Sequence, residues 1–350
     1  MATLRSKNNP IIKPNDVKPS RADYEVLCVI NAGVIRMDDE VILLLRVAER
    51  PLNTDPNVYL SPFYDTFKKS LQSIKFPKDS LQYDFTDSRV IKTEDTMYLT
   101  SISHLRVARS KDGVNFIIEN KPSFFPENKY EAYGIEDCRI SKVEGVYYIS
   151  YSAISPLGIT ACLASTEDFK LFKREGVILQ PDNKDIAIFP EKINGKYYAL
   201  HRPTSGVFSK NDIWIAESSD MITWGNHRHL MGSREDYWDN GRIGAGGVPF
   251  RVKQGWLEIY HGADKNDRYC LGAVLLDKNQ PWKVIARSEV PLMEPVEEYE
   301  IKGFFGNVIF TCGNLYEEGI VKIYYGAADT YMAYAEIPMA DVYENLKIKK

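Results

Sequence analysis

The feature that most constrains the fold of this 350-residue chain is a unit that recurs five times. Each copy has an apolar strand, a turn, a second strand ending in small or polar residues, and a further strand. The copies begin near residues 31, 136, 189, 246 and 306, and their later strands lie at 101–116, 159–172, 212–224, 269–277 and 330–337. Short Val, Ile, Tyr, Leu and Phe runs separated by Gly, Asp, Asn and Lys turns predict an all-β chain with an internal repeat.

Three or four antiparallel strands repeated five times match the blades of a five-bladed β-propeller. The later units are spaced about 50–60 residues apart, which fits propeller repeats. An irregular β-sandwich is the alternative, but it leaves the internal similarity unexplained. We expect residues 1–350 to form one catalytic propeller domain, with an insertion in the first blade at about residues 50–100.

The composition excludes several classes of protein. A net charge of −4 with interspersed signs lacks the basic stripe of a nucleic-acid binder. No apolar run approaches the roughly 20 residues of a membrane span, and the N-terminal residues lack the apolar region of a secretory signal. Five scattered cysteines predict neither a disulfide framework nor a zinc site. We therefore expect a cytoplasmic protein without metal or organic cofactor.

The innermost strands of a propeller converge on a central funnel, so polar residues at equivalent positions of different blades can form one site. Such residues follow or interrupt the apolar strands in every unit. They are Asn31, Arg46, Glu136, Asp137, Arg139, Lys184, Asp185, His201, Arg202, Tyr260, His261, Asp264, Tyr325 and Asp329.

Asp137 lies in the sequence GIEDCRIS, between Glu136 and Arg139. A carboxyl group beside another acid can have a raised pKa and donate a proton, while the arginine fixes its geometry. A turn with solvated charges is the alternative. The position at the start of a blade makes Asp137 a candidate acid.

A second group lies in NKDIAIFPEKINGKYYALHRP, where Lys184 and Asp185 precede one strand and His201 and Arg202 end the next. Lysine, histidine and arginine together could hold an anion or sugar hydroxyls. Alternatively, His201 is a hydrogen-bonded histidine at a strand end.

Two glutamates occupy strands that are otherwise apolar. Glu258 interrupts GWLEIYHGAD, on the same side as Trp256 and Tyr260, and Glu217 ends the run IWIAE. A buried ionised carboxylate is costly unless it is compensated. Either residue could be an ordinary ion-pair partner, but together with Asp137 they look like the carboxylates of glycoside hydrolysis.

The run of GIEDCRIS, NKDIAIFPEKINGKYYALHRP, RIGAGG, YHGAD and YYGAAD resembles glycoside hydrolase family 130, the β-mannoside phosphorylases and β-mannosidases. The resemblance spans about residues 31–335 and implies a five-bladed β-propeller. It also implies that Asp137 is the proton donor, acting through a hydroxyl of the bound mannose. Asn31 and Arg46 match the residues that hold this sugar, and Asp264 resembles a residue that organises the site.

Three positions depart from the phosphorylases of that family. Thr160 stands near the position of an arginine, Glu217 replaces a tyrosine, and Glu258 replaces an apolar residue. Losing a cation and gaining two carboxylates would repel a phosphate dianion at short range. The chain therefore resembles the hydrolytic β-1,2-mannosidase branch, in which paired glutamates would polarise a water molecule.

We predict from these residues a glycosidase that cleaves β-mannosides, with β-1,2 linkages favoured, by inversion. Asp137 would be the acid, Glu217 and Glu258 would activate water, and a β-manno-oligosaccharide would be the substrate. The predicted sugar-binding residues are Asn31, Arg46, Arg139, Lys184, Asp185, His201, Arg202, Tyr260, His261, Asp264 and Asp329.

Two other functions stay open. One is a phosphate-dependent β-mannoside phosphorylase that releases mannose 1-phosphate, with Lys184, His201 and Arg202 as its anion site. The other is a non-catalytic carbohydrate-binding propeller.

Overall fold

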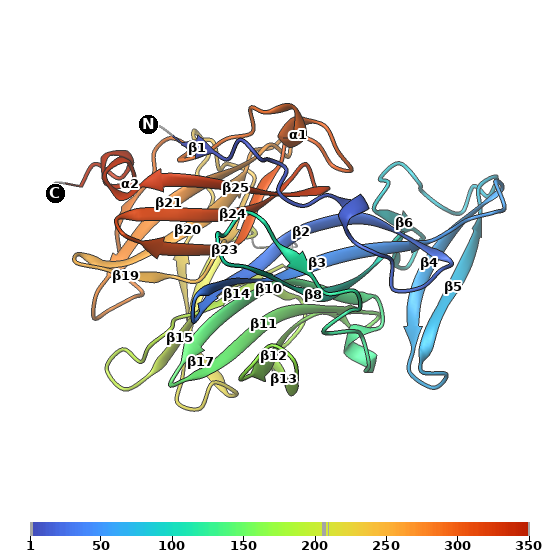
Figure 1. The fold of residues 1–350 in the computed structure, drawn as a ribbon, viewed down its shortest axis with the longest axis horizontal. Coiled ribbons are helices and arrows are strands. Elements are labelled where there is room, and N and C mark those ends of the chain that lie inside the picture. Colours follow the sequence, from blue (N-terminus) through green and yellow to red (C-terminus); the bar gives the residue numbers. More distant parts are fainter. Residues whose placement is uncertain (1–2, 205–207, 209, 349–350) are drawn as a thin grey trace.

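The computed structural model describes residues 3–204, 208 and 210–348 (Figure 1). Most of their strands belong to five antiparallel groups, whose inner strands contact one another in a ring. The five-bladed β-propeller predicted from the repeat is confirmed. Within these residues, no helix is both long and apolar enough to cross a membrane.

Each blade runs from an inner strand outward. Blade 1 contains β2 (Tyr24–Met37), β3 (Glu40–Pro51), β8 (Ile102–Ser110) and β9 (Ile117–Ile118); blade 2 contains β10 (Gly134–Val143), β11 (Val146–Ser155), β12 (Gly158–Thr166) and β13 (Lys173–Leu179). Blade 3 contains β14 (Asn183–Ile188), β15 (Tyr197–Pro203), β16 (Ile213–Ser218) and β17 (Trp224–Met231). Blade 4 contains β18 (Arg242–Ala245), β19 (Phe250–Val252), β20 (Gly255–Ala263), β21 (Tyr269–Asp277) and β22 (Val284–Arg287). Blade 5 contains β23 (Ile309–Glu317), β24 (Ile320–Ala327), β25 (Tyr331–Pro338) and β1 (Leu4–Arg5).

The ring closes in two ways. The inner strands contact one another in turn, from β2 to β10, β14 and β18, while β23 contacts both β20 and β2. In addition, β1 comes from the N-terminal end of the chain and pairs with β25 as the outer strand of blade 5, with Leu4 opposite Glu336 and Arg5 opposite Ala335. The first and last parts of the described chain therefore share one sheet.

The faces of β20 show how the blades pack. Leu257 and Ile259 lie in an apolar cluster with residues of blade 5, whereas Trp256 and Tyr260 lie in a cluster with residues of blade 3. All four side chains are fully buried. Both faces of this strand are thus covered by neighbouring blades, which explains its nearly continuous apolar sequence.

A β-bulge interrupts the inner strand of each of the first three blades. The register shifts between Ile30 and Gly33, and Asn31 has a φ of 50°; equivalent shifts surround Asp137, with a φ of 48°, and Asp185, with a φ of 54°. Asparagine and aspartate tolerate this left-handed conformation better than other residues that carry a Cβ. Because a bulge re-aims a side chain, these polar groups leave the strand's alternation and turn toward the ring axis.

The segment between β3 and β8 forms two hairpins, β4 (Val58–Asp65) with β5 (Ser70–Pro77) and β6 (Val90–Lys92) with β7 (Met97–Leu99). The first hairpin projects away from the blades at one end of the molecule (Figure 1). The segment also returns to the ring, because Tyr64 donates its backbone N–H to Ala132 and the Arg89 guanidinium lies 3.9 Å from the Phe305 ring centroid. Short helices α1 (Glu298–Ile301) and α2 (Met339–Asn345) accompany blade 5.

Candidate active site

Asp137 is the centre of a polar cluster that three strands build. Asn31 of β2 donates its side-chain amide to Oδ1 of Asp137 over 2.9 Å, and Arg46 of β3 donates from Nη1 to the same oxygen over 3.0 Å. The Nη2 of Arg46 reaches Oε1 of Glu136 at 2.7 Å. One arginine thus bridges two consecutive acids of β10, which fixes the orientation of the Asp137 carboxylate.

Cations around Asp137 keep it ionised. Burial alone would raise the pKa of this carboxyl group, but Arg46, Lys184, Arg139 and the Asn31 amide outweigh burial and lower it. Lys184 is half-buried, and within the described residues its side chain forms neither a hydrogen bond nor an ion pair. A cation without a fixed anionic partner therefore lies beside the candidate acid.

Asp329 brings the fifth blade to the same place. It follows β24 with a φ of 46°, and burial, together with the charges of Asp137 and Glu136, raises its pKa to about 6 against the opposing effect of Arg46 and Arg89. Two nearby aspartates thus have pKa values displaced in opposite directions, a pattern found at acid–base sites. We call Asn31, Arg46, Glu136, Asp137, Lys184 and Asp329 the acid cluster.

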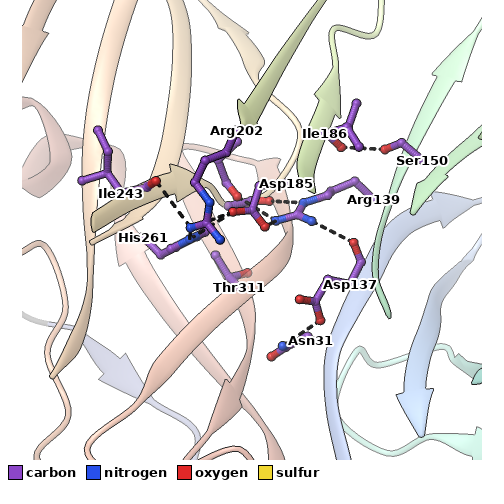
Figure 2. Close-up of polar contacts among 12 residues, drawn as sticks. Asn31, Asp137, Arg139, Ser150, Asp185, Ile186, Arg202, Ile243, His261 and Thr311 are labelled. Carbon is purple, nitrogen blue, oxygen red and sulfur yellow. Dashed lines mark hydrogen bonds and ion pairs between the residues drawn. The ribbon is translucent and has the colours of Figure 1, made fainter. Parts of the chain in front are cut away.

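A second charged group surrounds Asp185 (Figure 2). Its carboxylate lies 3.2 Å from Nη2 of Arg139, 3.0 Å from Nη1 of Arg202 and 3.4 Å from Nε2 of His261. Burial opposes ionisation, but Arg202, His261 and Arg139 hold the pKa of Asp185 well below its usual range. We call Arg139, Asp185, Arg202 and His261 the buried cluster, since all four are shielded from solvent.

Arg139 links the two clusters. Its guanidinium donates to the backbone carbonyl groups of Asp137, Ala245 and Gly246 at 2.8, 2.7 and 2.9 Å. It therefore ties blade 2 to blade 4 across the axis, while Asp185 compensates its charge. This arrangement is a structural support for the bulge that carries Asp137.

Glu258 lies beside this support and is fully buried. Its Oε1 accepts the backbone N–H of Gly246 over 2.8 Å, and its Oε2 has no hydrogen-bond partner among the described residues. Burial raises the pKa of Glu258 well above its usual value and outweighs the opposing effects of the Gly246 N–H and Arg139. A neutral, enclosed carboxylic acid cannot serve as the base that activates water.

Glu217 lies elsewhere, on β16, the third strand of blade 3. It lines a narrow crevice with Tyr198, Arg228 and Trp282, and hydrogen-bonds to Tyr198. The structure therefore does not bring Glu217 together with Glu258 and Asp137. Strand alternation indicated the face of Glu258, and the end of an apolar run singled out Glu217, but neither pattern indicated that these side chains pack against others.

Three further predicted residues have local partners. The Tyr260 hydroxyl donates to Asp239 at 2.8 Å. The Asp264 carboxylate accepts backbone N–H groups of its own turn. His201 lies 3.2 Å from the Asn183 side-chain oxygen and 3.1 Å from His227; burial and His227 lower its pKa to about 3.

Sequence reasoning missed Arg89. This residue belongs to the insertion, which has no counterpart in the other repeats, so blade equivalence could not point to it. Its charge nevertheless acts on Asp329 of the acid cluster. Among the described residues, no group of three or more His, Cys, Asp or Glu side chains is placed to hold a metal ion.

Carboxyl groups with pKa values displaced in opposite directions are used by enzymes that act on glycosides, and the family of this chain belongs to that class. The chain is a member of glycoside hydrolase family 130, because the family model described as beta-1,4-mannooligosaccharide phosphorylase matches residues 98–348. It is 45% identical to a beta-1,2-mannobiose phosphorylase of Listeria innocua over 100% of this chain and 99% of that protein. It is also 43% identical to a 1,2-beta-oligomannan phosphorylase of Thermoanaerobacter, over 69% of this chain and 80% of that protein.

The solved structure of beta-1,2-mannobiose phosphorylase from Listeria innocua in complex with beta-1,2-mannobiose superposes with a TM-score of 0.97. It is 44% identical and covers 100% of both chains.

These relatives correct our functional prediction. Full-length similarity to phosphorylases contradicts hydrolysis by paired glutamates. The physical reason lies at the three positions that differ from the phosphorylase pattern. Thr160 is buried within β12, where its hydroxyl points to the Ala153 carbonyl oxygen. Glu258 is enclosed, and Glu217 lies away from Asp137. None of them presents a charge to an anion that approaches the acid cluster, so the argument from repulsion fails.

Proposed function

We propose that this enzyme phosphorolyses β-1,2-linked mannosides, with inorganic phosphate as the acceptor and mannose 1-phosphate as the product. The observation that carries the proposal is Lys184, whose charge lowers the pKa of Asp137 and whose side chain has no ion-pair partner within hydrogen-bonding distance among the described residues. Similarity over the whole chain to a beta-1,2-mannobiose phosphorylase supports the same choice of reaction and linkage.

The reaction is a single displacement. A phosphate oxygen forms a bond to the anomeric carbon of the mannosyl group while the glycosidic C–O bond breaks, and the departing oxygen takes a proton. Attack from the face opposite the leaving group inverts the anomeric configuration. Asp137 supplies the proton, through a hydroxyl of the mannosyl residue as the family resemblance implies.

Phosphate binding would prepare Asp137 for this task. In the unliganded site, Arg46 and Lys184 favour the ionised carboxylate. An incoming phosphate dianion neutralises part of that positive charge and adds negative charge beside Asp137, so its pKa rises toward the working pH. Nucleophile binding and protonation of the acid are thereby coupled.

The decisive experiment incubates the enzyme with β-1,2-mannobiose in the presence and absence of inorganic phosphate and follows mannose and mannose 1-phosphate by chromatography. We expect equal amounts of the two products and no turnover without phosphate. Release of two mannose molecules at the same rate in phosphate-free buffer would overturn the proposal.

A further inference from the structure

A separate cavity of about 460 Å³ lies between the insertion and blade 1. Its walls come from β4 of the insertion, from residues 85–91, from the ends of β2 and β3, and from Phe304 of the loop before β23. The volume lies within the range of roughly 300–1,000 Å³ that small-molecule sites occupy. None of the acid-cluster residues lines it, so it is distinct from the centre of the reaction.

Aromatic rings form the apolar part of this cavity. Tyr59 and Phe85 lie with their centroids 4.7 Å apart, and Phe304 contributes a third ring. Tyr59 is 39% exposed, while Phe85 and Phe304 are only half-buried. Large rings left accessible in a concave site offer apolar surface to a ligand.

Polar groups line the same cavity, and three of its four charged side chains, Glu25, Arg50 and Asp87, are in ion pairs. Arg50 contacts Glu25 at 2.6 Å and Asp87 contacts Arg89 at 2.8 Å. The ammonium group of Lys78 lies 4.6 Å from the Tyr59 ring centroid. The remaining polar lining consists of amide and hydroxyl groups, from Asn53, Thr86, Ser88 and Thr100. Lys78 is the one lining charge without an ion pair in the described residues, and it lies over a ring, whereas the other rings beside hydroxyl and amide groups suit a neutral sugar.

The cavity and the acid cluster share a wall. Ser88 and Val90 line the cavity, and Arg89 between them acts electrostatically on Asp329. Phe304 also lines the cavity, and its backbone N–H donates to the Thr330 hydroxyl, next to Asp329, over 2.7 Å. Phe305 lies under the Arg89 guanidinium. A chain of sugars that extends from the acid cluster over Arg89 would reach this cavity next.

We propose that this cavity binds the distal sugars of a neutral manno-oligosaccharide whose reacting linkage lies at the acid cluster. The identity of the sugar rests on the proposed function, whereas the presence of a second sugar-binding region rests on the cavity itself. The insertion thus favours substrates longer than a disaccharide.

The test measures binding separately from turnover. The Asp137→Asn enzyme is titrated calorimetrically with β-1,2-mannobiose and with the corresponding tetrasaccharide. The same titrations are then made with double variants that also carry Phe85→Ala or Ser88→Trp. Phe85→Ala removes a ring, and Ser88→Trp fills the cavity without deleting any existing side-chain contact named above. We expect either change to weaken tetrasaccharide binding roughly tenfold and to leave the disaccharide unchanged.

Phe67→Ala is the matched control, because Phe67 is an almost fully exposed ring of the same insertion outside this cavity. It should alter neither affinity. The inference would be overturned by any of three results: unchanged tetrasaccharide affinity in both cavity variants, two binding sites per chain, or no tetrasaccharide binding. If phosphorolysis is absent but the chain-length effect on binding persists, only the proposed function fails.

Discussion

Asp137 and Asp185 occupy the same place in neighbouring blades but have different surroundings. Both lie at a bulge of the inner strand with a left-handed backbone conformation. Asp137 shares Arg46 with Glu136 and has the unpaired Lys184 nearby, whereas Asp185 is enclosed by Arg139, Arg202 and His261.

The difference shows that the repeat fixes where a polar side chain projects, while neighbouring blades decide its chemistry. Asp137 retains 5% exposure and Asp185 retains none. Asp137, with the unpaired Lys184 nearby, can exchange a proton, and an anion can bind beside it. Asp185, whose charge is compensated by the buried Arg139 and Arg202, has a structural role in the ring.

The largest effect should come from Asp137→Asn. This change keeps the shape of the side chain but removes the proton donor, so we expect phosphorolysis to fall about 10³-fold. Steady-state kinetics with β-1,2-mannobiose would measure the loss. A mannoside with a leaving group that needs no protonation should be affected far less, and an equal loss for both substrates would remove Asp137 from the role of acid.

Asp185→Asn should act on folding instead. Removing this charge leaves Arg139 and Arg202 buried without their carboxylate, and we expect a loss of about 3–5 kcal/mol in the free energy of unfolding. Urea denaturation would measure it. The control Asp23→Asn breaks an exposed ion pair with Arg21 and should cost less than about 1 kcal/mol. Comparable losses in both variants would erase the distinction between the clusters.

Lys184→Met should raise the KM for phosphate by about tenfold or more, because a charge-assisted contact to the anion is lost. The KM for the mannoside should change little. Lys173→Met provides a control, since that lysine is exposed and pairs with Glu175. If phosphate affinity is unaltered in Lys184→Met, the anion must bind elsewhere and the comparison with Asp185 loses its basis.

Glu258→Gln should have the smallest effect below about pH 4.5, within about 1 kcal/mol of stability, because the glutamate side chain is then neutral in both the folded and the unfolded chain. The variant should differ from the wild type in how the free energy of unfolding depends on pH. The folded protein retains a proton that the unfolded chain releases near pH 4.5, so wild-type stability should decline as pH rises above that value. Denaturation at several pH values should show a flatter profile for the variant, and parallel profiles would refute a protonated Glu258.

The ring and part of the acid cluster were predictable because both follow from repetition. Equivalent strand ends indicated that Asn31, Asp137 and Asp329 could meet at one axis, and they do act on one another there. β20 pairs with β21 without a register shift, so Glu258 keeps the side of Trp256 and Tyr260 that alternation indicates.

What alternation could not reveal is what covers each face. The side of β20 that holds Glu258 packs against blade 3, and the outer position of Glu217 depends on how far β16 lies from the axis. The role of Arg89 could not be predicted for a different reason: the repeat does not indicate where an insertion contacts the blades. Contacts between distant segments, and not local patterns, decide these cases.

The pairing of β1 with β25 ties catalytic competence to the order of synthesis. Asn31 and Arg46 leave the ribosome early, whereas Asp329 and the partner strand of β1 leave it late. Until then, Asp137 has only part of its final electrostatic surroundings. An incomplete or prematurely ended chain would carry the acid without the fifth-blade carboxylate, so activity is a property of the finished ring and of no single blade.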